Sequence, residues 1–115
     1  MSELKLNLVF DDYQIKRAKP ARGSSVIHVN KRWIGKEVSI IPLPFDVDEK
    51  VVDKSIGEDG LHHLELSVKE VFSKTVSDRK DVGFFYLKES LLGLFFLIVE
   101  APEIVYWNFF SWLFP

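Results

Sequence analysis

Alternating apolar and polar positions predict that the N-terminal part of the chain is built from short β-strands. In Leu4–Phe10 every second residue, counted from Leu4, is apolar, as in a strand with one buried face. Asp11-Asp12 marks a turn, and Tyr13–Lys16 begins a second extended piece. The β-branched run Val26–Val29 and the segment Glu37–Ile41 predict further strands, the last ended by prolines. We therefore expect a small β module at this end of the chain.

One helical turn is expected between the last two of these strands. Asn30 is suited to cap a turn through Arg32 and Trp33, and Gly35 is suited to end it in a left-handed conformation. Trp33 lies between apolar strands, so we expect it to anchor the core and not to stack on bases.

The predicted module is too small to be stable by itself. Three or four short strands in residues 1–44 bury little apolar area. Self-association is the natural remedy, and intertwined dimers of hairpins are one form of it. We therefore expect a homodimer.

The pattern changes after Pro44. Residues 45–60 are acidic and predict a linker. In residues 61–81, apolar residues at helical spacing predict an amphipathic helix over 61–77, although Leu64, Leu66 and Val68 also alternate as in a strand.

Residues 82–115 are expected to form an apolar, helical tail, which makes the predicted fold class α+β. Eleven of the sixteen aromatic residues lie between Phe84 and Phe114. The uncharged run Ser90–Val99 is shorter than the roughly 20 residues of a membrane-spanning helix. Three interpretations stay open: a tail packed against 61–77, an interfacial membrane anchor, or the remnant of a displaced reading frame.

The charge is divided along the chain. The net charge is −2, but residues 1–44 hold eight Lys/Arg and four Asp/Glu, which gives +4. Between Ile15 and Lys36 there is no acid at all, and like charges this dense favour an anionic partner. The predicted DNA-contacting cations are Lys16, Arg17, Lys19, Arg22, Lys31, Arg32 and Lys36.

No arrangement of residues typical of catalysis or metal binding is found. There is no cysteine, and the adjacent His62 and His63 have diverging side chains, with His28 far away in sequence. The Ser24-Ser25 pair beside Gly23 lacks the frame of a nucleophile elbow. We expect a protein that is not an enzyme and has no metal, cofactor or small-molecule substrate. The absent cysteine and the absent signal sequence favour the cytoplasm.

The segment Arg22–Ile41 resembles a family of small transposon-encoded proteins of archaea, which is similar to the AbrB-like swapped-hairpin DNA-binding superfamily. The match lies in Trp33-Ile34-Gly35-Lys36 and the preceding Lys31, within residues 4–43. Asn30 stands where the family usually has proline, and Gly23 and Ser24 belong to a loop that matches loosely. The resemblance implies a dimeric swapped-hairpin β-barrel whose basic loops lie on DNA, with a transposon-associated or regulatory role.

Two other functions remain open. In the first, the protein is an adaptor that uses residues 82–115 to meet a membrane surface or a protein partner. In the second, the β module belongs to a toxin–antitoxin antidote and the tail binds the toxin.

Overall fold

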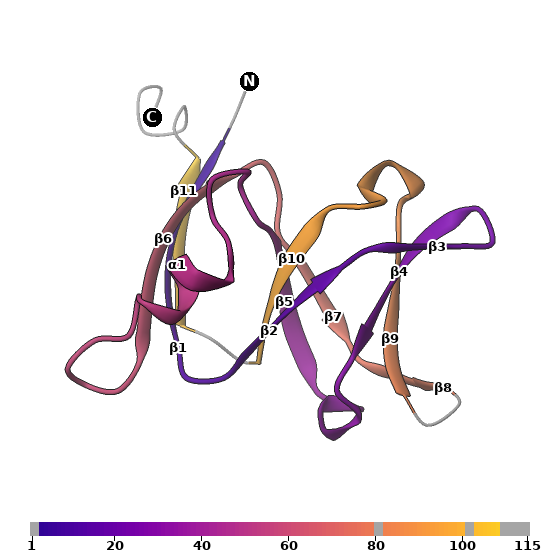
Figure 1. The fold of residues 1–115 in the computed structure, drawn as a ribbon, viewed down its shortest axis with the longest axis horizontal. Helices are drawn as coiled ribbons and strands as arrows, with labels where there is room; N and C mark the ends of the chain where they lie inside the picture. Colours follow the sequence, from indigo (N-terminus) through magenta and orange to yellow (C-terminus); the bar gives the residue numbers. More distant parts are fainter. Residues whose placement is uncertain (1–2, 80–81, 101–102, 109–115) are drawn as a thin grey trace.

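The structure, a computed structural model, describes residues 3–79, 82–100 and 103–108, and of residues 79, 82–84, 89 and 103–108 it describes the backbone alone. It is built almost entirely from β-strands (Figure 1). The strands are β1 (Leu4–Phe10), β2 (Tyr13–Arg17), β3 (Lys19–Ala21), β4 (Ser24–Val29), β5 (Glu37–Pro42), β6 (His62–Val68), β7 (Phe72–Thr75), β8 (Ser77–Arg79), β9 (Val82–Leu87), β10 (Phe95–Glu100) and β11 (Glu103–Asn108). The helical elements are the short helix α1 (Glu49–Asp53) and the 3-10 turns η1 (Lys31–Trp33) and η2 (Glu89–Leu91).

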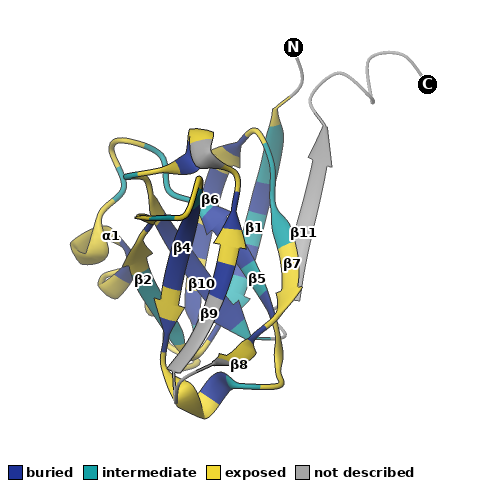
Figure 2. Ribbon diagram, turned by 90° about the vertical axis from the view of Figure 1, so that its right-hand side faces the viewer, coloured by how far each residue is buried: buried dark blue, intermediate teal, exposed yellow. Residues whose placement is uncertain are grey.

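The strands form three antiparallel sheets that lie side by side in Figure 1. The first has the order β11-β1-β6, the second β2-β10-β5-β7 and the third β3-β4-β9-β8. The second sheet lies between the other two, and apolar residues of two separate cores cover its two faces. Buried positions occur along the strands of all three sheets (Figure 2). On β5, Ile40 belongs to the core shared with the third sheet, and Ile41 to the core shared with the first.

The chain contains two copies of one structural unit. β1 begins at Leu4 and β6 at His62, 58 positions later, and the same spacing separates η1 from η2 and β5 from β10. We call residues 4–42 the first copy and residues 62–100 the second copy. Few residues are identical between them, so the repeat lies in the fold and in the pattern of buried positions.

The two copies are interlocked. β2 and β5 of the first copy both pair with strands of the second, β10 and β7 respectively. Each sheet also contains one pair in which equivalent residues face each other. These pairs are Asn7 with Glu65, Ile27 with Phe85, and Ile40 with Ile98. Equivalent residues face each other only on a twofold axis, so the copies are related by pseudo-twofold symmetry.

The predicted α+β class is wrong, because the helices expected after residue 60 are strands. In β6 buried and exposed residues alternate strictly from His62 to Val68, with Leu64 and Leu66 inside. The alternating pattern therefore prevailed over the helical one, because β1 offers β6 a complete antiparallel partner.

The predicted helical tail is also wrong within the described residues. Its first part forms β9, η2 and β10, and residues 103–108 form β11 against β1. Phe96–Val99 are all buried because β10 lies in the middle sheet, which explains an apolar run without alternation. Residues 109–115 of the predicted tail lie outside the described part of the chain. The stretch expected to be a linker carries α1, whose Val52 is fully buried.

Candidate nucleic-acid interface

All seven predicted cations are exposed, but the structure does not bring them together. Three lie around the β3–β4 hairpin: Arg17 ends β2, Lys19 begins β3, and Arg22 is at the hairpin turn. We call this the hairpin end. Three lie beyond the other end of β4, at η1 and just after it: Lys31, Arg32 and Lys36. We call this the turn end.

The distance between the two ends is set by β4. A strand rises about 3.3 Å per residue, so the six residues of β4 separate the two groups by roughly 20 Å. Lys16 lies between the groups, on β2. The cations between Ile15 and Lys36 therefore do not form a single continuous basic patch.

At the turn end, acids from outside the basic segment neutralise two of the three cations. Asp12 accepts a hydrogen bond from Arg32 Nη2 at 2.7 Å, and Glu100 lies 3.2 Å from Lys36 Nζ. Both pairs are exposed to solvent. The local charge count could not show them, because Glu100 comes from the second copy and Asp12 precedes the segment.

At the hairpin end, no cation faces a carboxylate among the side chains that the structure describes. Arg17 Nε donates to the carbonyl of Gly93 at 3.1 Å, and its guanidinium lies over the ring of Phe95. Lys19 and Arg22 form no ion pair or side-chain hydrogen bond in the part of the chain described.

Lys88 is an exposed cation near the hairpin that sequence reasoning missed. It immediately precedes η2 in the second copy, and its carbonyl accepts a hydrogen bond at 2.9 Å from the hydroxyl of Ser25, which is fully buried. The repeat could have pointed to this residue, because Lys88 lies 58 positions after Asn30 and therefore precedes η2 as Asn30 precedes η1.

The hairpin is closed by a two-residue turn at Arg22-Gly23. Both residues have positive φ, 47° and 81°, which is characteristic of a type I′ turn. Ala21 and Ser24 pair on either side of it, and the Ser24 hydroxyl donates to the Ala21 carbonyl at 3.1 Å. Gly23 and Ser24 thus shape the hairpin, and Arg22 is carried at its tip.

The predictions for the turn before β5 are confirmed. The Asn30 side chain accepts a hydrogen bond from the backbone N–H of Arg32 and caps η1. Trp33 is 1% exposed, and Ile34 packs against the same core. Gly35 has φ +83° and its N–H donates to the carbonyl of Val76 in the second copy.

A polar hollow of about 580 Å³ lies between β2 and β4. Lys16 and His28 line it, together with Gln14, Asn30 and Glu49. Gln14 Oε1 accepts the backbone N–H of Asn30 at 3.0 Å, which fixes the orientation of its amide. Glu49 opposes the positive charge of Lys16, so this hollow is not a concentrated anion site.

The two adjacent histidines point to different environments, as expected. His62 is buried, with Nδ1 within hydrogen-bond distance of the Val52 carbonyl and the Ser55 hydroxyl. His63 is exposed and lies 2.8 Å from Asp59. The pKa of Asp59 is lowered from 3.8 by the backbone N–H of Leu61 and, next, by His63. Among the described residues, no cluster of three or more His, Asp or Glu is arranged to hold a metal ion.

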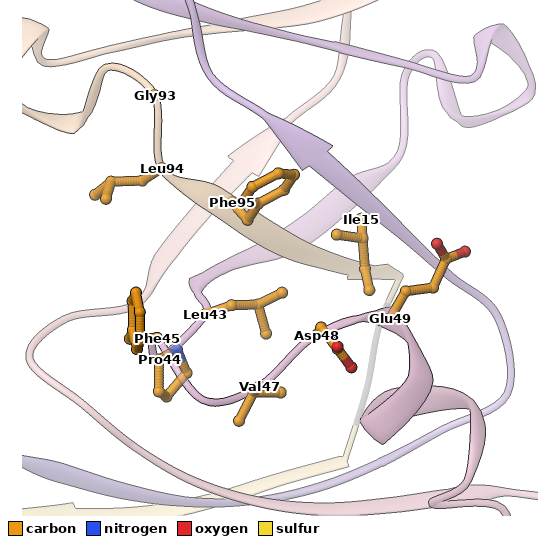
Figure 3. A pocket seen from close by; sticks show the side chains of 10 residues that line it. All are labelled: Ile15, Leu43, Pro44, Phe45, Val47, Asp48, Glu49, Gly93, Leu94 and Phe95. Atoms are coloured by element: carbon orange, nitrogen blue, oxygen red, sulfur yellow. The ribbon is translucent and has the colours of Figure 1, made fainter.

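An apolar groove of about 610 Å³ lies beside the hairpin end (Figure 3). Leu43 and Phe45 line one side of it, and Leu94 and Phe95 line the other. Phe45 is fully exposed and Phe95 is 53% exposed. The second copy has Leu94 and Phe95 where the first has Lys36 and Glu37, so the two copies present different chemistry at equivalent positions.

No protein-family model, curated protein or solved structure matches this chain. In the parts of the chain that the structure describes, no helix has the length and apolar character needed to cross a membrane.

Proposed function

We propose that this protein binds duplex DNA through the exposed cations of its first copy and that it is not an enzyme. The observation that carries the proposal is that Lys19, Arg22 and Lys31 face no carboxylate partner within the described residues, although the chain is acidic overall. Exposed lysines and arginines of this kind gain free energy by releasing counterions from phosphates.

The architecture supports the same proposal. The resemblance of Arg22–Ile41 to swapped-hairpin DNA-binding proteins implies two interlocked copies of a small β unit. This chain contains two interlocked copies, because β2 and β5 pair with β10 and β7. We therefore propose that one chain is the DNA-binding unit, in place of the expected homodimer, with a transposon-associated or regulatory role.

The test is a salt titration with the full chain. Fluorescence anisotropy with a labelled duplex of about 25 base pairs should show a logarithm of affinity that falls linearly with the logarithm of salt concentration. Each phosphate contact contributes a slope of about −0.9. A Lys50→Ala/Lys54→Ala variant, which removes two exposed cations from the region of α1, is the matched control and should bind like wild type. Failure to bind at 50 mM salt would contradict the proposal.

A second candidate function, association with an anionic membrane surface, is favoured by the apolar groove. There Phe95 lies exposed beneath the guanidinium of Arg17, a pairing suited to the boundary between lipid headgroups and acyl chains. Co-sedimentation with vesicles of phosphatidylserine and phosphatidylcholine tests it. Binding that is lost in Phe45→Ser/Phe95→Ser would support this function, and no binding to vesicles would exclude it.

A further inference from the structure

We infer that the hairpin end, and not the turn end, is the surface that contacts DNA, and that Arg22 is its leading contact. This inference rests on the proposed function. It assigns the site to Arg22, Lys19, Arg17 and Lys88, of which only the first three belong to the basic segment visible in the sequence.

The first argument is the balance of charge at the two ends. Arg32 and Lys36 must give up Asp12 and Glu100 before they can meet phosphates, and any DNA near them also approaches those two carboxylates. Lys19 and Arg22 have no such competing partner in the described residues. Among the described side chains their charge is therefore not neutralised, whereas two of the three cations at the turn end are paired with acids.

The second argument is the backbone of Arg22. With φ 47° it is the single non-glycine residue with positive φ in the described chain. The first central position of a type I′ turn favours asparagine, aspartate or glycine, because a larger side chain is strained there. The Arg22 side chain forms no ion pair or hydrogen bond with the described residues that would offset this strain. Strain of this kind is typical of positions held for a ligand.

The third argument is that the hairpin is held rigidly. Ser24 closes its turn, and the buried hydroxyl of Ser25 attaches β4 to the start of η2 in the second copy. Arg17, at the base of the hairpin, is fixed on Gly93. β4 pairs with β9 from Ser25 onward, so only the tip of the hairpin, which carries Arg22, lies beyond the paired part of the third sheet. An arginine at such a tip can reach base edges in the major groove of B-DNA. Lys19, Arg17 and Lys88 are then placed to meet the flanking phosphates.

The test compares two full-length variants that each remove two cations. Lys19→Ala/Arg22→Asn alters the hairpin end, and Lys31→Ala/Lys36→Ala alters the turn end. We expect the hairpin variant to lose about tenfold or more in affinity and to flatten the salt slope by between about 1 and 2. The turn variant should lose less than about threefold. Equal losses, or a larger loss in the turn variant, would overturn the inference and leave the proposed function standing. If wild type does not bind DNA, both fall.

A second measurement separates a DNA contact from a structural role of Arg22. Asparagine suits a type I′ turn, so Arg22→Asn alone should raise the melting temperature by about 2–5 °C while it weakens DNA binding. A lower melting temperature would show that Arg22 stabilises the fold, and unchanged DNA affinity in a stabilised variant would show that the tip does not touch DNA. Either result overturns the assignment of Arg22.

Discussion

The pseudo-twofold symmetry makes a quantitative prediction at Gly35 and Gly93. These glycines follow η1 and η2 at equivalent positions, with φ +83° and +82°. Their N–H groups donate to equivalent carbonyls of the opposite copy, those of Val76 at 2.9 Å and Ala18 at 3.0 Å. Alanine at either position should therefore disturb an equivalent turn, and the two substitutions should have similar effects on stability.

The magnitude follows from what the new methyl group would meet. A Cβ at Gly35 has no atom within 4 Å, and one at Gly93 approaches only Arg17 Nη2, at 3.8 Å. Steric clash contributes nothing, so the cost is that of a left-handed alanine, about 1–2 kcal/mol. Gly35→Ala and Gly93→Ala should each lower the free energy of unfolding by this amount. The two values should agree within about 0.5 kcal/mol, a margin that allows for different effects of the two substitutions on the unfolded chain.

Urea unfolding followed by circular dichroism measures both free energies of unfolding. An m-value equal to that of the wild type would show that the variant exposes the same surface area on unfolding. The exposed Ser90→Ala serves as control and should shift stability by less than about 0.5 kcal/mol. If the two glycine variants differ by more than about 1 kcal/mol, the two copies are not energetically equivalent. If neither variant is destabilised, the left-handed conformation is not required.

Three further predictions follow from the packing and the charges. Trp33→Ala should lower the free energy of unfolding by about 3–5 kcal/mol, and the equivalent Leu91→Ala by about 2–5 kcal/mol, because both residues are buried in the core between the second and third sheets. Urea unfolding measures these losses, and a loss below about 1 kcal/mol would contradict the role of either residue in the core. Because the folded-state pKa of Asp59 is lowered, its contribution to stability is complete above 3.8 and is lost as pH falls through the lowered value; an NMR titration of the Asp59 carboxyl that gave a pKa above 3.8 would refute this. Because the copies are interlocked, calorimetry should show one transition with equal calorimetric and van't Hoff enthalpies, whereas two independent domains would give two transitions.

The first copy could be predicted from sequence because its signals are local. The alternating pattern predicted β1, the β-branched run predicted β4, and Asn30 and Gly35 predicted the turn between β4 and β5. Each of these depends on neighbouring residues alone, and each is confirmed.

The second copy could not be predicted because its signals conflict or concern distant residues. The residues of β6 fit a helix and a strand equally well until β1 is known to lie beside them. β10 lacks alternation because both of its faces are covered. The repeat itself is faint, since identical residues at the spacing of 58 are few. They are Leu6 and Leu64, Leu8 and Leu66, Lys16 and Lys74, Gly35 and Gly93, and Ile40 and Ile98.

The candidate site was predictable in composition but not in arrangement. The sequence shows which residues are cationic, and all seven are exposed. It does not show that β4 holds them in two groups, or that Asp12 and Glu100 pair with the cations of one group. Those facts depend on pairing between the copies, which no local pattern encodes.

The connection between the two copies also determines how many chains share one fold. It runs from the end of β5 at Pro42 to the start of β6 at His62, and it is itself held by Val52, which packs in the core. A tether of this length keeps the second copy at an effective concentration on the order of millimolar beside the first. At micromolar protein the interlock therefore closes within one chain. At much higher concentration the same strand pairs can form reciprocally between two chains, with this segment as the hinge, so concentrated stocks should accumulate an exchanged dimer that dissociates slowly on dilution.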